Sequence, residues 1–230
     1  MMSAPATLDL RRPRGTGDLT RADHAYVALR EDIITAELPP GTVLREEELM
    51  QRLGTGRTPI REAIQQLIRD GFVTVMSRRG TFVSAINITD LAAIYEVRIH
   101  LESWEARLAA ERLTAEERAA AQSLIAELDA LTVDDGHEPL LALDRRIHRF
   151  VYSCGKNEYL AETLDQYHNL SLRIIYFAMK RYPALTPSLD QVVHDQRAML
   201  EALCRGDGDA AERIAREHVI KFEAAVRALI

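Results

Sequence analysis

Four polar side chains interrupt the apolar stripes of predicted helices in the C-terminal half of the chain. Asp144 and His148 are four residues apart, so both project from one face of a helix. His218 lies in the centre of the stripe of the last predicted helix, and His194 borders the stripe of the helix before it. A carboxylate on a buried face is costly unless it is paired or metal-bound, so the set predicts one cation site shared by three helices.

The ligand types narrow the choice of cation. Imidazole and carboxylate without thiolate suit zinc, which we expect first, and also nickel or manganese. Four protein ligands leave positions open on a six-coordinate metal, where water or a carboxylate effector could bind. Taken singly, each histidine also has a simpler interpretation, as a core residue with satisfied hydrogen bonds.

Arginines near this set are candidates for binding an organic anion. Arg98 shares an apolar stripe with Tyr95 and precedes Glu102 by one helical turn. Its planar guanidinium could bind the carboxylate of an effector together with Tyr95, or it could form an internal ion pair with Glu102. Both interpretations stay open. Arg173 is a second candidate, and His168 could belong either to the site or to the core.

A basic segment lies closer to the N-terminus. Residues 51–80 contain six arginines but only two acidic residues, whereas residues 89–230 contain 17 basic and 24 acidic residues. This asymmetry indicates two functions in two domains, although the whole chain carries a net charge of −6.

The elements that carry the arginines follow a recognisable order. The spacing of apolar residues predicts a helix from about residue 22 and a second over 46–53. A third helix is predicted with Thr58 as its N-cap, Pro59 at its first position and Gly71 after its end. Two β-rich runs over 72–75 and 81–83 then form a hairpin. Three helices followed by a hairpin are typical of a winged helix-turn-helix.

In such a module the third helix reads the major groove through its N-terminal residues, and the wing contacts the minor groove. The predicted DNA-binding residues are Arg57, Thr58 and Arg61 in the helix and Arg78, Arg79 and Gly80 in the wing. A bidentate arginine–guanine pair is the chemistry expected of the first group. Solvated surface charge is the alternative for each arginine, but their position on the recognition elements of an acidic chain favours DNA.

The remainder of the chain is predicted to be helical. Six stretches, separated by Gly-, Asp- and Pro-containing breaks, are typical of an antiparallel six-helix bundle. They cover residues 89–112, 114–132, 138–153, 157–181, 187–205 and 208–229. We therefore predict a mainly α protein with a flexible tail over 1–20, a winged helix-turn-helix over 21–86 and an all-α domain for effector, metal and dimerisation over 89–230.

Composition excludes several other classes. A hydrophobic fraction of 47% and a charged fraction of 28% are those of a globular protein and not of a disordered one. No run approaches the roughly 18 apolar residues of a membrane span, and the first 20 residues lack the apolar region of a secretory signal. Two cysteines exclude a disulfide scaffold and favour the cytoplasm.

The stretch LPPGTVLREEELMQRLGTGRTPIREAIQQLIRDGFV, followed by RRGTFV, resembles the DNA-binding domain of GntR-family bacterial transcription regulators. The resemblance covers about residues 22–84. It implies that Arg57, Thr58 and Arg61 contact the operator, with Gly80 at the wing. Gly56 departs from the serine usual at that position, which removes a hydroxyl contact to phosphate.

Residues 89–230 resemble the FadR C-terminal ligand-binding domain of the same regulators, through VRIHLESWEARLAA, LDRRIHRFVYSCGKNEYL and HDQRAMLEALCRGDGDAAERIAREHV. The resemblance implies a divalent metal on Asp144, His148, His194 and His218, and an organic acid as effector. Six helices rather than seven imply the shorter, VanR-like variant.

Together these features predict a regulator that binds a palindromic operator as a dimer and responds to a small carboxylate held near the metal. The resemblance implies a repressor, because repression is the usual mode of action in this family. Two alternatives stay open. One is a metal-dependent enzyme with a fused DNA-binding head, although no general base is placed by a motif. The other is a regulator in which the metal itself is the signal.

Overall fold

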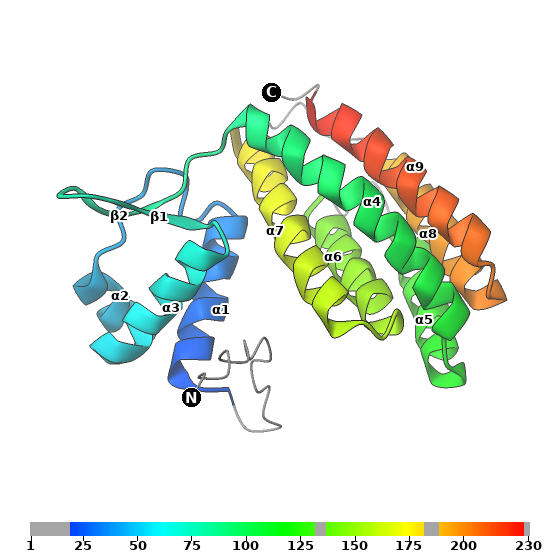
Figure 1. The fold of residues 1–230 in the computed structure, drawn as a ribbon, viewed down its shortest axis with the longest axis horizontal. Coiled ribbons are helices and arrows are strands. Elements are labelled where there is room, and N and C mark those ends of the chain that lie inside the picture. Colours follow the sequence, from blue (N-terminus) through cyan, green and yellow to red (C-terminus); the bar gives the residue numbers. More distant parts are fainter. Residues whose placement is uncertain (1–18, 132–136, 182–188, 228–230) are drawn as a thin grey trace, which may run out of the picture.

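The computed structural model describes residues 19–131, 137–181 and 189–227. Most of the tail expected at residues 1–20 lies outside them. The chain forms an N-terminal head, residues 19–84, and a helical bundle, residues 88–227 (Figure 1). The predicted fold class is confirmed: mainly α, with a winged helix-turn-helix followed by six antiparallel helices.

The head contains α1 (Arg21–Ile34), α2 (Glu46–Leu53), α3 (Arg57–Arg69), β1 (Val73–Met76) and β2 (Gly80–Val83). Thr20 begins α1 with a capping box, in which its side chain and that of Asp23 each bind the other's backbone N–H. The strands pair antiparallel, with Val73 opposite Val83. Their turn forms the tip of the wing.

The turn between α2 and α3 depends on one glycine. Gly54 ends α2 in the left-handed conformation, with φ of 59°, which costs glycine little. The third helix then begins at Arg57 with Gly56 as its N-cap, two residues before the N-cap that we expected at Thr58. Pro59 still lies in the first turn, where its missing N–H has no helical partner to lose.

The bundle contains α4 (Ile88–Arg112), α5 (Ala115–Ala130), α6 (His137–Cys154), α7 (Glu158–Arg181), α8 (Leu189–Arg205) and α9 (Gly208–Arg227). The long helix α4 runs beside α9, and α6 and α7 lie toward the head (Figure 1). None of the described helices is long and apolar enough to cross a lipid bilayer.

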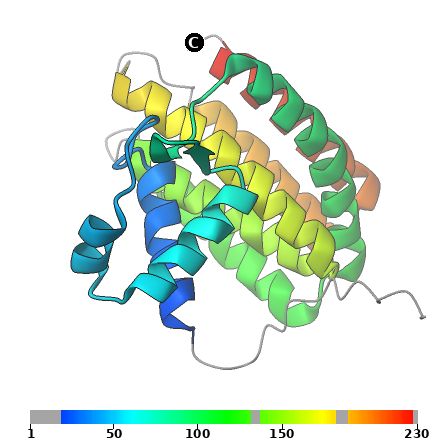
Figure 2. The ribbon, with the colours of Figure 1, turned by 60° about the vertical axis from the view of Figure 1, so that its left-hand side comes forward.

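The head packs against α7 (Figure 2). One hydrophobic cluster joins Leu29 and Ile33 of α1 to Leu172 and Ile175 of α7, so the two parts share a core. Around its edge, ion pairs cross the boundary: Arg30–Asp165 at 3.3 Å, Arg145–Glu31 at 2.6 Å and Lys180–Glu37 at 2.6 Å. A shift of α7 would therefore displace the side chains of the head that pack against it.

Candidate metal centre

Three of the predicted ligands meet inside the bundle. Asp144 and His148 lie one turn apart on α6, and His218 reaches them from α9. A ligand atom of each lies within 4.8 Å of a ligand atom of the other two. All three side chains are buried, with exposed fractions of 4–6%. This geometry brings one carboxylate and two imidazoles close enough to share a cation.

Contacts with neighbouring groups of the protein orient the side chains of His148 and His218. Nδ1 of His148 donates to the main-chain oxygen of Asp144 at 2.9 Å, and Nδ1 of His218 lies 3.7 Å from the carboxylate of Asp195. Asp195 is held in turn by the ammonium of Lys221 at 3.2 Å. A carboxylate behind a histidine is the arrangement that orients ligands in metal sites.

Charges within the cluster balance. Burial alone would raise the pKa of Asp144, but the His148 imidazole holds it well below its usual range. The same pairing, working against burial, raises the pKa of His148 to about 10. The charges of Arg98 and His148 thus offset those of Asp144 and Glu102. A metal bound here would displace the His148 proton, since metal ligands must be deprotonated.

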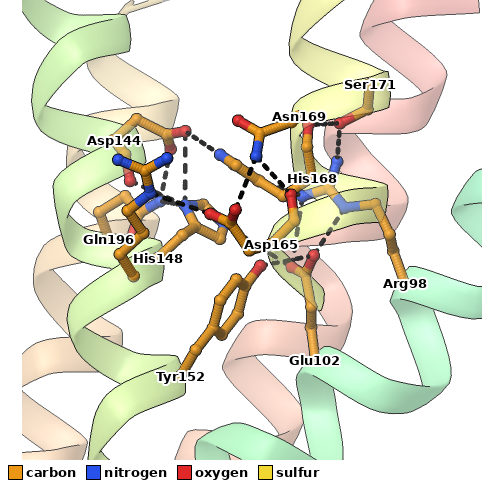
Figure 3. Close-up of polar contacts among 11 residues, drawn as sticks. Arg98, Glu102, Asp144, His148, Tyr152, Asp165, His168, Asn169, Ser171 and Gln196 are labelled. Atoms are coloured by element: carbon orange, nitrogen blue, oxygen red, sulfur yellow. Dashed lines mark hydrogen bonds and ion pairs between the residues drawn. The ribbon is translucent and has the colours of Figure 1, made fainter. Parts of the chain in front are cut away.

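Arg98 forms the ion pair that its spacing from Glu102 allowed. Its Nε donates to Glu102 at 2.6 Å and its Nη1 to Ser171 at 2.6 Å (Figure 3). The guanidinium also lies 5.0 Å from the centre of the Tyr95 ring. Arg98 and Tyr95 are both at most 2% exposed. The guanidinium is therefore occupied by the protein itself, and the structural interpretation of Arg98 is favoured over direct effector binding.

His168 belongs to the site and not merely to the core. Its ring stacks on that of His148 with centroids 4.2 Å apart, and its Nδ1 lies 3.2 Å from Nη2 of Arg98. Arginine has no acceptor, so Nη2 donates and Nδ1 accepts. The proton of the neutral ring is then on Nε2, 3.7 Å from the Asp144 carboxylate (Figure 3). Nε2 makes no hydrogen bond in the described part of the chain. His168 also forms a second group with Glu102 and His148 whose ligand atoms lie within 4.8 Å of one another, but a metal there would have to displace the Nε2 proton.

Two small cavities adjoin the cluster. One, of about 10 Å³, is lined by Glu102, His148, Tyr152 and His218 together with apolar side chains. The other, of about 20 Å³, has Asp144 in an otherwise largely apolar wall. Each has room for roughly one water molecule or one ion. An organic acid would need the surrounding helices to move apart.

Our expectation for His194 has to be corrected, because this side chain is exposed and lies apart from the cluster. The buried face of α8 contains Val192, Asp195, Gln196 and Met199. His194 precedes Gln196 by two residues, or about 200° around the helix, and so points to solvent. Gln196 occupies the place in the cluster: its Nε2 donates to Oδ1 of Asp144 at 2.6 Å.

Arg173 also lies away from the cluster. It is buried on α7, and its Nη2 donates to the main-chain oxygen of Ser84, between the wing and α4. Burial lowers its pKa to about 10. Its position is that of a link between the bundle and the head, in place of the effector contact that we expected.

The predicted DNA-binding residues lie together on the outside of the head. Arg57, Thr58 and Arg61 are exposed at the start of α3, and Arg78, Arg79 and Gly80 are exposed at the wing. Acidic residues of α2 hold the first two arginines: Arg57 Nη2 is 2.9 Å from Glu47, and Arg61 Nε is 2.8 Å from Glu46. Exposed ion pairs of this kind are weak, so each arginine can exchange its carboxylate partner for a phosphate group.

Several members of the site were not among the residues predicted from the sequence. Gln196, Asp195 and Ser171 carry no motif by themselves, and Tyr152, which donates to Glu102 at 3.0 Å, reads as a packing residue. One signal was present for Gln196, since it follows Val192 by four residues and precedes Met199 by three, which is the spacing of a buried face.

Comparison with known proteins identifies two family models along the chain. The model described as "Bacterial regulatory proteins, gntR family" matches residues 21–83, and the FCD domain matches residues 93–221. Together they cover the head and most of the bundle.

Individual relatives agree with these models. The HTH-type transcriptional repressor RspR of Escherichia coli is 27% identical over 88% of this chain and 87% of its own length. The HTH-type transcriptional repressor GlaR of the same organism is 29% identical over 85% and 90%. The Nta operon transcriptional regulator of Aminobacter aminovorans is 34% identical, over 54% of this chain and 59% of that protein.

Solved structures share the fold. E. coli McbR/YncC superposes with a TM-score of 0.80 at 22% identity, covering 92% of this chain and 99% of the other. A GntR family member from Pseudomonas syringae pv. tomato is 27% identical with a TM-score of 0.52, covering 90% and 85%.

Proposed function

The chain belongs to the gntR family of bacterial regulatory proteins and has an FCD domain, and we propose that it represses transcription in response to a small carboxylate. Residues 21–86 would bind a pseudo-palindromic operator as part of a homodimer in the cytoplasm. Residues 89–230 would dimerise and bind the effector close to a divalent metal. Its curated relatives are named as transcriptional regulators, which argues against the alternative of an enzyme.

The observation that carries the sensing half is the buried cluster of Asp144, His148 and His218. A cation there would be held by one carboxylate and two imidazoles, with Asp195 behind His218. Three such ligands leave positions free for water or for an oxygen of the effector. The adjacent cavity of about 10 Å³ suits an ion of this kind.

The DNA-binding half rests on the arginines of α3 and the wing. Arg57 and Arg61 are held by Glu46 and Glu47 in an orientation that projects from the start of α3. On DNA they would exchange these carboxylates for base edges and phosphates. Two heads in a two-fold dimer would read the two half-sites of the operator.

Helix α7 is the element that could couple the two halves. On one turn it presents His168 and Ser171 to Arg98, and two residues later Arg173 binds the backbone at Ser84. An effector that moved α7 while opening the small cavities would therefore shift the junction between wing and α4. A coupling of about 1–3 kcal/mol would change operator affinity usefully.

A metal sensor is the second candidate, and it shares the same cluster. One experiment separates the two. Purified protein would be screened by thermal unfolding against small carboxylates with and without a divalent metal, and operator DNA selected from a random pool would then be titrated by fluorescence anisotropy. Effector response requires a change on adding acid to metal-loaded protein, whereas a metal sensor changes operator affinity on chelation alone.

A further inference from the structure

Helix α8 also faces the cluster and contributes the side-chain amide of Gln196 to it. Gln196 of α8 is 1% exposed, and its Nε2 lies 2.6 Å from Oδ1 of Asp144 and 3.4 Å from Nδ1 of His148 (Figure 3). Its Oε1 is also buried and has no hydrogen-bond partner among the described residues. A buried carbonyl oxygen without a partner destabilises the folded state, so a group that would satisfy it has to be sought nearby.

Rotation of the amide explains it. A half-turn about the Cγ–Cδ bond exchanges Oε1 and Nε2, which have nearly the same size. Next to a bare Asp144 carboxylate the amide must present its N–H groups, because two oxygens repel. Next to a carboxylate that binds a cation, the amide gains by presenting its oxygen to the same cation, and the N–H groups turn away.

The other neighbours do not compete for this position. His168 accepts from Arg98 at Nδ1 and so presents an N–H, not a lone pair, toward Asp144. His194 is exposed on the far side of α8. Among the described side chains that contact Asp144, Gln196 is thus the neutral oxygen donor.

We propose that Oε1 of Gln196 is the fourth protein ligand of the metal, and that this amide shifts the site from zinc toward a hard, six-coordinate cation such as Mn²⁺. The proposal rests on the proposed function, because it requires a cation on Asp144, His148 and His218. Carbonyl and carboxylate oxygens suit Mn²⁺, whereas Zn²⁺ gains more from a nitrogen or sulfur donor. It also revises the preference for zinc expected from an Asp/His₃ set.

The test compares four variants of the full-length protein after removal of bound metal. Gln196→Ala deletes the donor, Gln196→Glu keeps an oxygen, Gln196→His substitutes nitrogen, and His194→Ala is the matched control on the same helix. Mn²⁺ and Zn²⁺ are titrated separately by calorimetry, and circular dichroism confirms that each variant is folded.

We expect Gln196→Ala to weaken Mn²⁺ binding about tenfold or more, with Gln196→Glu and His194→Ala near wild type. Gln196→His should raise Zn²⁺ affinity relative to Mn²⁺. Wild-type affinity for Mn²⁺ in folded Gln196→Ala would overturn this inference alone. Failure of the wild-type protein to bind either metal would instead overturn the metal site of the proposed function, and this inference with it.

Discussion

Arg173 of α7 donates a hydrogen bond to the main-chain oxygen of Ser84, the residue that follows the wing. No carboxylate pairs with Arg173 in the described part of the chain, so its buried charge is compensated chiefly by backbone. Because the same helix contacts Arg98 through Ser171, one rigid element connects the interior of the bundle to the head.

This link predicts an uncoupled variant. Arg173→Met keeps most of the volume but removes the hydrogen bond to Ser84. We expect its metal binding to match wild type, while the change in operator affinity caused by effector falls by at least half. Anisotropy titrations with and without effector measure both quantities. A full wild-type response in this variant would show that the signal does not pass through Arg173.

The recognition helix gives a second prediction. Arg57→Ala and Arg61→Ala should each weaken operator binding by about 1–3 kcal/mol if they read bases, and should reduce preference at one base position. Arg69→Ala, at the opposite end of α3, is the control and should stay close to wild type. Unchanged affinity in both test variants would remove the assignment of α3 as the reading helix.

The buried Arg98–Glu102 pair predicts a large loss of stability. Removing Arg98 leaves Glu102, 4% exposed, without its main charge partner. We expect Arg98→Ala to lower the free energy of unfolding in urea by about 3–5 kcal/mol. Arg197→Ala breaks an exposed pair with Asp129, and its effect on the free energy of unfolding should be much smaller. Equal, small effects would contradict the structural role given to Arg98.

Glu105 predicts a pH dependence of stability. It is fully buried in α4 against Gly155, and burial raises its pKa to about 7 although Arg112 opposes the shift. Stability from this group is complete below pH 4.5, the value of the unfolded chain, and is lost as the pH rises toward 7.

Replacing the Glu105 carboxyl group with an amide removes this loss of stability at high pH. Glu105→Gln should therefore be more stable than wild type by about 1–3 kcal/mol at pH 8, and the difference should shrink toward zero near pH 4. Urea unfolding at the two pH values gives the comparison, and Glu116→Gln, an exposed position on α5, serves as the control. A difference in stability that grew at low pH would contradict a raised pKa of Glu105 in the folded state.

Much of this fold can be predicted from local features of the sequence. Start and stop residues and apolar spacing predicted every described helix within a few residues, because local chemistry decides these boundaries. The ligand on α8 was different. Val192 and Val193 are both apolar, so the buried face could be centred on either side of them. Packing against α9 and α5 decides the rotation of the helix, which buries Gln196 and exposes His194.

The effector residues show a second limit. Spacing alone allowed Arg98 to pair with Glu102 or to bind an anion, and Ser171 and His168, which complete its shell, come from 70 or more residues away along the chain. Arg173 lies on an apolar stripe in the sequence, but its partner is a backbone oxygen, which no side-chain pattern can reveal.

The most direct test of the central claim, a cation held inside the bundle, is elemental analysis of purified protein. We expect one divalent ion per chain in wild type and in His194→Ala, and its loss in the double variant His148→Ala, His218→Ala. Wild-type occupancy in a folded double variant would contradict the claim.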